Sequence, residues 1–354
     1  MENARREMRI GSLYGLASAL LFGASTPLSK LLLPDVGPLM LAALLYLGAA
    51  AFITVLRVPS AVRRQHSAQA RLRRSDVPIL CLIIGFGGVL GPILMLFGLA
   101  KISALAGSLL LNLEAVFTIL IAVFVFREHL GLDSAIGSVL VILGAALLGY
   151  QPGPVRGDIA GVLAIAGACL SWAIDNNLSQ RLSLRDPMAV VQLKASGAGL
   201  TSMTLALVSG HAFPAPAPLI GSLLLGGVSY GASLLFVMLA LRHLGAAREA
   251  AWFSTAPFVG AALSIAVFGA LPNMPELLGT LVIVVGAFVL VHERHSHVHT
   301  HGILEHDHLH SHDEHHQHEH DGSMIEPHSH LHRHAWTTHE HAHASDLHNR
   351  HDHA

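Results

Sequence analysis

The chain has 354 residues, of which 52% are hydrophobic and only 12% are charged. A soluble enzyme usually has about a quarter of its residues charged, so the composition excludes an ordinary soluble enzyme. The formal net charge of −2 combines a net +6 in residues 1–291 with a net −8 in residues 292–354, and since no basic face accompanies a binding motif, we expect no nucleic-acid partner.

Ten apolar stretches follow one another from the N-terminus to residue 292. A bilayer core about 30 Å thick is crossed by about 20 apolar residues in a helix. The loops between the stretches are mostly short and their polar faces are small, which disfavours buried helices of a large soluble protein. The predicted transmembrane helices lie near residues 11–32, 36–56, 77–99, 103–126, 133–150, 157–180, 187–209, 218–241, 247–269 and 275–292.

Basic residues concentrate in the loops on one side of these ten helices. With the N-terminus in the cytoplasm, the inside loops hold eleven arginines and the outside loops hold only Lys101 and Arg156. Because Lys and Arg favour the cytoplasmic side, and an even number of helices returns the chain to its starting side, we expect both termini in the cytoplasm. The predicted location is an integral, multi-pass position in a bacterial inner membrane, with the lipid bilayer as a partner.

The two halves of the apolar region resemble each other. Residues 22–29 (FGASTPLS) align with residues 172–179 (WAIDNNLS), and a Gly-x-x-x-Gly pair occurs in the third and again in the eighth stretch. The last stretch of each half carries glycines seven residues apart, at 137 and 144 and at 279 and 286. Small residues at such spacings let helices approach closely in lipid. Since each half has five stretches, the second half must cross the membrane in the opposite sense, as in the inverted repeats of transporters.

These residues give the chain a family resemblance. The pattern is carried by Leu21-Phe22-Gly23 and Ser171-Trp172-Ala173, by the segments 113–117 (LEAVF) and 127–130 (REHL), and by the glycine-paired stretches that end each half. Over about residues 11–292 the chain resembles the EamA-like branch of the drug/metabolite transporter superfamily. The resemblance implies an α-helical basket around a central site and transport of small organic molecules, commonly as efflux.

The predicted fold class is an all-α membrane protein with two inverted five-helix repeats and a disordered tail. Its expected organisation is a cytoplasmic N-terminus at 1–10, one EamA-like repeat at 11–150, a second at 157–292 and a His-rich cytoplasmic tail at 293–354. No nucleotide-binding motif occurs in the chain. We therefore expect a secondary-active transporter that is not an enzyme and uses no cofactor for transport.

A few polar residues inside the predicted helices are candidates for substrate binding or coupling, because polar and ionisable groups in a membrane are costly. By a rise of 1.5 Å per residue, Asp175 lies roughly 8–10 Å and Lys194 roughly 10–12 Å from the cytoplasmic ends of their helices. The two could form a structural ion pair or take a binding role. The other candidates could equally serve as interhelical contacts or, for the tyrosine, as an interface anchor. The full candidate set is Ser25, Thr26, Glu114, Asp175, Asn176, Asn177, Lys194 and Tyr230.

Glu114 lies near the middle of the fourth predicted helix. No cation lies at the same depth on a helix adjacent in sequence. A carboxyl group without a partner at that depth can carry a proton, so we hypothesise that protons are the coupling ion and that Glu114 carries them. A hydrogen-bonded neutral acid with a structural role is the alternative.

Residues 292–354 hold 23 of the 27 histidines of the chain, many in His-x-His steps. With few apolar residues this segment lacks a core, which predicts disorder in the free state. Neutral imidazole binds zinc, nickel, cobalt and copper, and the interleaved acids add oxygen ligands. Bending is needed to bring successive imidazoles together, so several weak sites are favoured over one closed site. The candidate ligands are His295, His297, His299, His301, His306, His308, His310, His312, His315, His316, His318, His320, His328, His330, His332 and His334.

Three functions remain open on the sequence. The first is a transporter, favoured as an exporter, of a small metabolite or drug-like solute whose tail binds a divalent transition metal. The second is a divalent-metal transporter for nickel, cobalt or zinc. The third is a membrane-anchored metal-sensing or storage protein. A solubilising tail or a pH-sensing tail are the alternatives to metal binding. The sequence does not indicate an oligomeric state.

Overall fold

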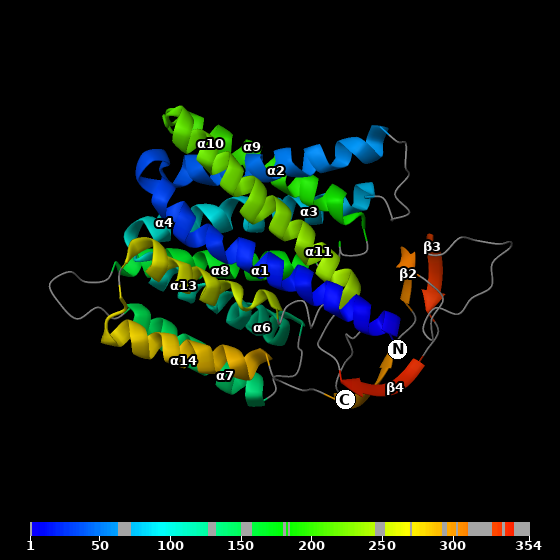
Figure 1. Cartoon of the computed structure of the whole chain (residues 1–354). Coiled ribbons are helices and arrows are strands. Elements are labelled where there is room, and N and C mark those ends of the chain that lie inside the picture. The colour runs from blue at the N-terminus through cyan, green and yellow to red at the C-terminus, as the bar shows by residue number, and fades with distance from the viewer. Residues whose placement is uncertain are drawn as a thin grey trace.

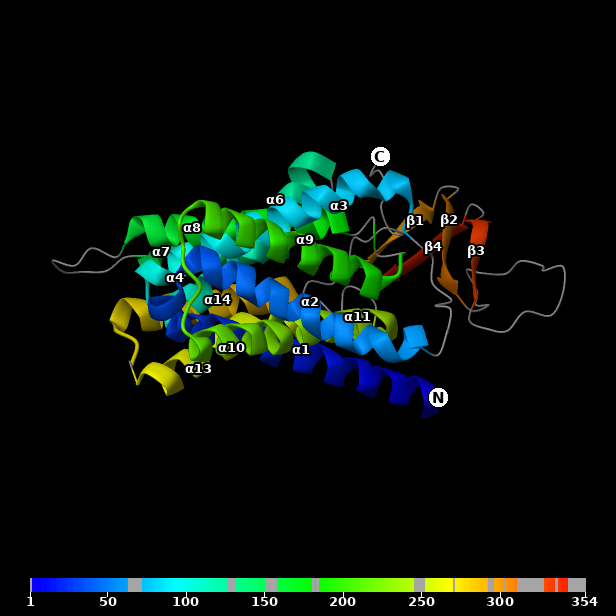
Figure 2. The same cartoon turned by 90° about the horizontal axis from the view of Figure 1, so that it is seen from above.

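In the part of the chain that it describes, the computed structural model places helices between residues 2 and 291 and strands in the C-terminal tail (Figure 1). It describes residues 2–62, 72–126, 132–149, 158–179, 182, 185–244, 252–269, 271–291, 296–301, 304–310, 328–334 and 337–342. Figures 1 and 2 both show the helices packed as one bundle of long rods. The N-terminus and the four strands lie beyond the same end of that bundle.

The helices of the two halves follow the same order along the chain. The first half consists of α1 (Glu2–Val36), α2 (Pro38–Val62), η1 (Arg74–Asp76), α3 (Val77–Ile83), η2 (Ile84–Leu90), α4 (Gly91–Lys101), α5 (Ala104–Leu110), α6 (Leu113–Phe126) and α7 (Leu132–Gly149). The second half consists of α8 (Ile159–Ser179), α9 (Pro187–Val208), α10 (Pro216–Leu225), η4 (Gly226–Ala232), α11 (Ser233–Leu244), α13 (Ala256–Phe268) and α14 (Met274–Val291).

Each of the ten predicted ranges contains helix, but some ranges are interrupted. The third is split by η2 and the eighth by η4, and both of these segments are π-helical turns at the glycine-rich part of the range. The fourth breaks between α5 and α6. π-Helical turns inside longer helices leave backbone groups open to other partners and are frequent at functional sites.

Length and composition make the described helices suitable for a membrane. Two shorter apolar helices cover 256–268 and 274–290, and α9 lies outside the long, apolar set although it has 22 residues. Lipid would cover apolar side chains such as Phe124 and Leu271, which are 77% and 83% exposed. The seven stretches long and apolar enough to cross a bilayer are Met8–Val36, Pro38–Arg57, Arg74–Lys101, Ala104–Val125, Leu132–Gly149, Ile159–Ser179 and Pro216–Ala240.

The helices pack in a pattern that is the same for both halves. In the first half α1 packs against α11 and α13, and in the second half α8 packs correspondingly against α4 and α6. Two further contacts, between α2 and α9 and between α7 and α14, join equivalent helices of the two halves. The halves are therefore interleaved rather than placed side by side as separate domains.

Glycines allow a close approach between α7 and α14. A Cβ atom on Gly144 would lie 2.8 Å from the carbonyl oxygen of Gly279, and one on Gly137 would lie 3.0 Å from that of Gly286. Any larger residue would push the two backbones apart. The close packing predicted from the seven-residue glycine spacing is confirmed.

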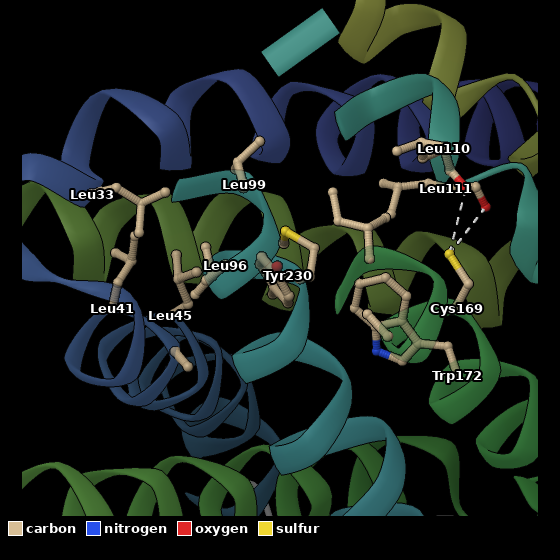
Figure 3. Packing of buried hydrophobic residues seen from close by; sticks show 14 of the residues in the cluster. Leu33, Leu41, Leu45, Leu96, Leu99, Leu110, Leu111, Cys169, Trp172 and Tyr230 are labelled. Atoms are coloured by element: carbon tan, nitrogen blue, oxygen red, sulfur yellow. Dashed lines mark hydrogen bonds between the residues drawn. The ribbon is translucent and has the colours of Figure 1, made fainter. Parts of the chain in front are cut away.

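A core of leucines lies between α2 and α4, and it continues to the aromatic side chains of η4 and α8 (Figure 3). Cys169 of α8 lies at the break between α5 and α6. Its thiol donates to the carbonyl oxygens of Leu110 and Leu111 at 3.6 and 3.9 Å. The thiol is thus shared between two carbonyl groups at the end of α5, where backbone acceptors lack helical partners.

Charged side chains bind the ends of helices together. Lys30 of α1 donates to the carbonyl oxygens of Leu99 and Ile102, at 2.5 and 2.9 Å, where α4 ends. Lys101 pairs with Asp158 at 2.9 Å, and both are more than a third exposed. At the other ends of the same two spans, Arg185 pairs with Asp76 at 2.9 Å, and both are largely buried.

The part of the tail that the structure describes contains four strands, and the disorder expected of the free tail stays a prediction. β1 (Ser296–His301) pairs antiparallel with β4 (Thr337–Ala342), and β2 (Leu304–His310) pairs antiparallel with β3 (His328–His334). The composition argument considered only the missing core. The alternation of histidine with other residues indicated extended chain, because it has the two-residue period of a strand.

Candidate functional site

An ion pair between α8 and α9 lies inside the helix bundle. Lys194 donates to a carboxylate oxygen of Asp175, and the two side chains are 15% and 6% exposed. The other oxygen of Asp175 accepts from the Ser179 hydroxyl at 3.1 Å. The structure thus brings together the two charges that the depth arithmetic placed at a similar level. A buried pair of this kind is neutral as a unit but costly to break.

Asp175 packs directly on the backbone of η2. Gly87 has no side chain, and a Cβ atom there would overlap the Asp175 carboxylate. In this π-helical turn the Gly91 N–H donates to the carbonyl of Phe86, and residue 92, the next donor that the Gly87 carbonyl could use, is a proline without an N–H. The carbonyl of Gly87 is therefore left without a helical partner.

Two aromatic side chains donate to this carbonyl instead. The Tyr46 hydroxyl of α2 lies 2.9 Å from the Gly87 oxygen, and the Trp172 indole N–H of α8 lies 3.1 Å from it. Both side chains are buried. The π-helical turn thus becomes a polar junction between three helices. Gly87, which carries the shared carbonyl, also contacts Asp175 of the ion pair.

Glu114 has a hydrogen-bond partner that is a neutral amide and not a cation. Asn176 of α8 donates to a Glu114 carboxylate oxygen at 2.7 Å. Glu114 lies in the first turn of α6, just after the break that follows α5, and its carboxyl also interacts electrostatically with Asp175 and Lys194. The search along the sequence missed the partner because it considered only cations on adjacent helices, whereas the observed donor is a neutral amide 62 residues away.

Buried hydroxyl groups on α1, α5 and η4 form a further set of polar side chains in the bundle. Tyr230 of η4 is 2% exposed and Ser25 of α1 is fully buried. These two hydroxyls are neighbours, but neither reaches hydrogen-bonding geometry with any partner in the described residues. Ser29 and Ser108 are likewise buried without a partner there. Tyr230 is therefore an interior residue and not an interface anchor.

Aromatic rings connect Tyr230 with the two aromatic side chains that donate to the Gly87 carbonyl. Phe22 of α1 makes edge contacts with Trp172 and Tyr230, at ring-centroid distances of 6.3 and 5.6 Å. It also lies 5.2 Å from Phe253, and Tyr46 lies 5.5 Å from Tyr230. Aromatic rings in such arrangements give a rigid apolar surface with polar edges.

The remaining candidates on the helices, Asn177 and Thr26, are both buried. Asn177 is buried, and its amide donates to the carbonyl of Ala173 on its own helix at 2.9 Å. Thr26 is 2% exposed. The sequence did not single out Tyr46 as a site residue. Its position as the single tyrosine of the apolar helix α2 was the available signal.

The tail histidines are placed only in part. Those on strands β1, β2 and β3 are His297, His299, His301, His306, His308, His310, His328, His330, His332 and His334. Six others lie outside the described residues: His295, His312, His315, His316, His318 and His320. Over the part of the chain that the structure describes, no group of three or more His, Cys, Asp or Glu is arranged to hold a metal ion.

Taken together, the apolar helices, the duplicated packing and the polar groups held inside the bundle define a membrane transporter. The chain matches the EamA-like transporter family twice, over residues 9–150 and 159–292. It belongs to that family.

Two known relatives agree with this assignment. An uncharacterized transporter of Methanothermobacter thermautotrophicus is 30% identical over 293 residues, which cover 78% of this chain and 84% of the relative. The uncharacterized transporter YdfC of Bacillus subtilis is 28% identical over 99 residues, or 28% of this chain and 32% of the relative. A solved crystal structure superposes with a TM-score of 0.57 at 20% identity, over 79% of this chain and 95% of that one. This likeness concerns the fold alone.

Proposed function

We propose that the protein is a secondary-active exporter of a small metabolite or drug-like solute. The observation that carries the proposal is the buried ion pair of Asp175 and Lys194, set between the Glu114–Asn176 contact and the aromatic side chains. Structural ion pairs rarely need a second acid and a cluster of unpartnered hydroxyls beside them. Polar groups at such depth mark substrate and ion pathways. The resemblance to the EamA-like family supports export as the direction.

The ion pair favours a solute that carries one group of each sign. Such a solute can exchange the internal pair for two intermolecular pairs, one with Asp175 and one with Lys194. A solute with a single charge leaves the other protein charge buried and unpaired, which costs several kcal/mol. The hydroxyls of Ser25 and Tyr230 supply donors and acceptors for the remainder of the solute, and Phe22 and Trp172 supply its apolar contact surface.

Glu114 is the proposed proton carrier. Its partner, Asn176, is a neutral amide and does not neutralise a carboxylate, while Lys194 is engaged with Asp175. Protonation of Glu114 therefore removes a charge that its neighbours do not balance. Exchange of this proton with the bulk solution would couple solute movement to the proton gradient.

The proposed topology has ten membrane spans in two inverted repeats with both termini in the cytoplasm. In Figures 1 and 2 the N-terminus and the tail strands lie beyond one end of the bundle, as an even number of spans requires. The excess of arginine in the loops on that side supports the orientation. A fluorescent protein fused after Ala354 should fluoresce, and an alkaline phosphatase fused at the same place should be inactive.

We also propose that the tail binds a divalent transition metal: zinc, nickel, cobalt or copper. Its histidine content supports this. A metal transporter and a metal-sensing or storage protein are less favoured, because the described spans hold no group of three metal ligands and the transporter family covers the spans completely. Metal tolerance of cells with full-length protein, and with protein ending at Val291, separates these functions from solute export.

The transport proposal is tested in proteoliposomes that contain a pH-sensitive dye. The probes are alanine, putrescine, succinate and glucose, which represent zwitterionic, cationic, anionic and neutral solutes. We expect alanine to cause the largest solute-dependent proton movement. Glu114→Gln should abolish the proton movement, and Glu276→Gln, which changes a buried acid outside the site, should preserve it. Equal proton movement with Glu114→Gln and the unchanged protein would contradict proton coupling through Glu114.

A further inference from the structure

The strands of the tail are paired so that histidines oppose histidines. In the β1–β4 ladder, His297 lies opposite His341 and His299 lies opposite His339. In the β2–β3 ladder three more pairs are opposed, namely His306 with His332, His308 with His330 and His310 with His328. The register therefore contains five opposed histidine pairs within the described part of the tail.

The pairs of each ladder occupy alternate positions along the strands. Since successive residues of a strand belong to opposite faces, residues two apart share one face. The three pairs of the β2–β3 ladder therefore share a face, and the two pairs of the β1–β4 ladder also share one. Residues between the pairs, such as Asp307 opposite Leu331, belong to the other face.

Two opposed histidines lie closer together than two histidines on one strand. Directly opposed residues in an antiparallel ladder have Cβ atoms about 4.5–5.5 Å apart, whereas residues two apart on one strand are separated by about 7 Å. Two imidazoles at the shorter spacing can bind one ion with a ring nitrogen each, at about 2.0–2.1 Å from the metal. A site of this kind uses two protein ligands and leaves its other positions to water, so it does not require a group of three.

We propose that each opposed histidine pair of β1–β4 and β2–β3 binds one divalent transition-metal ion, and that these ions fasten the strands of the tail together. The inference rests on the proposal that the tail binds metal. It goes further because it assigns ligands by register instead of by composition. A flexible histidine-rich chain would use its histidines interchangeably, whereas a ladder distinguishes those with an opposed histidine from those without one.

The register supplies internal controls for this distinction. His301 lies opposite Thr337, and His334 lies opposite Leu304. These two histidines are on the same strands as the pairs but have no opposed histidine. Leu309 lies opposite Ser329, so a histidine introduced at position 309 would also lack one.

The test measures Ni²⁺ bound to the full-length protein in detergent by equilibrium dialysis. The pH is about 7.5, roughly one unit above the ordinary histidine pKa of about 6.5, so that the imidazoles are neutral. His306→Asn with His308→Asn removes one member from each of two pairs. His301→Asn with His334→Asn removes the same number of histidines but no member of a pair. All four changes lie in the tail, and gel filtration confirms that the membrane part remains folded.

We expect the first double variant to lose two Ni²⁺ ions from the tight-binding class, with affinity at those positions about a hundredfold weaker because the second ligand of each chelate is gone. The second double variant should retain the full number. As a gain-of-site test, Leu304→His should add one ion opposite His334, and Leu309→His should add none.

Equal losses in the two double variants, or equal gains from the two leucine substitutions, would overturn the register-based sites while leaving metal binding by the tail intact. Absence of Ni²⁺ binding by the unchanged protein would overturn metal binding by the tail and the paired sites together. Neither result would alter the solute-transport proposal, which the proteoliposome measurement tests separately.

Discussion

The first helices of the two halves, α1 and α8, occupy equivalent places in the packing but carry different chemistry. Ser25 of α1 aligns with Asp175 of α8, and Thr26 aligns with Asn176. In α1 these positions hold buried hydroxyls, and in α8 they hold a carboxylate paired with Lys194 and an amide bound to Glu114. At these aligned positions the duplicated scaffold therefore carries a charged group in α8 and none in α1, which separates the requirements of the fold from those of the site.

The same asymmetry extends to the partner helices. Lys194 stands seven residues after the proline that begins α9, and the residue seven positions after the first proline of α2 is Leu45. Leu45 belongs to the buried apolar core. The position is thus compatible with a leucine, so the lysine is not needed to form the helix. This supports a role for the ion pair in transport.

The largest expected effect comes from breaking the ion pair. Lys194→Met leaves the Asp175 carboxylate buried and unpaired, which should destabilise the protein by about 3–5 kcal/mol. Asp175→Asn combined with Lys194→Met should recover most of that loss. Leu45→Met is the matched change in the other half and should cost less than about 1.5 kcal/mol. Thermal unfolding in detergent compares these three variants with the unchanged protein. A Lys194→Met protein as stable as the unchanged one would show that the pair is not formed.

The next effect compares the glycine pairs of the two halves. Gly87→Ala places a methyl group against the Asp175 carboxylate, and overpacking of this kind costs about 1–3 kcal/mol. Gly227→Ala meets only ordinary contacts, with the Gly48 oxygen and the Phe52 Cβ atom both 3.5 Å away. We expect solute transport to fall with Gly87→Ala and to persist with Gly227→Ala. Similar behaviour of the two variants would contradict the close contact between η2 and α8.

An effect of comparable size is expected at the end of α4. Lys30→Met removes the ammonium group that donates to the carbonyl oxygens of Leu99 and Ile102. Hydrogen bonds from a charged donor contribute about 1.5–3 kcal/mol, so unfolding should begin at a lower temperature. Lys30→Arg retains a donor and is the control. If Lys30→Met unfolds at the same temperature as Lys30→Arg, these contacts do not stabilise the structure.

The smallest effect is expected for the exposed ion pair. Lys101→Ala removes the partner that lowers the pKa of Asp158. Because a lowered carboxyl pKa stabilises the folded state at neutral pH and the benefit is lost as the pH falls through that pKa, the variant and the unchanged protein should converge in stability under acid. Arg185→Ala, which breaks the more buried pair with Asp76, should cost more at neutral pH. A larger loss for Lys101→Ala would contradict this order.

Much of the membrane part could be predicted because its signals are local. Apolar length predicted helices in all ten ranges, and glycine spacing predicted close helix packing of the kind that α7 and α14 show. Helical rise was enough to place Asp175 and Lys194 at one level. Each of these inferences needs only a few neighbouring residues and the geometry of a helix.

The rest of the site depends on contacts between distant segments. The π-helical turn at η2 and the two donors that serve the Gly87 carbonyl come from three separate helices. Asn176 and Glu114 are neighbours only because α8 packs against α6. In the tail, the His-x-His period indicated extended chain, but the register that opposes histidine to histidine could not be read from composition.

The measurement that tests the central claim most directly is solute transport by the charge-neutral double variant, Asp175→Asn with Lys194→Met, in proteoliposomes. The account predicts a folded protein that no longer couples alanine to proton movement, while Leu45→Met, the matched change in the other half, remains active. Transport by the double variant at the rate of the unchanged protein would contradict the assignment of this ion pair to the site.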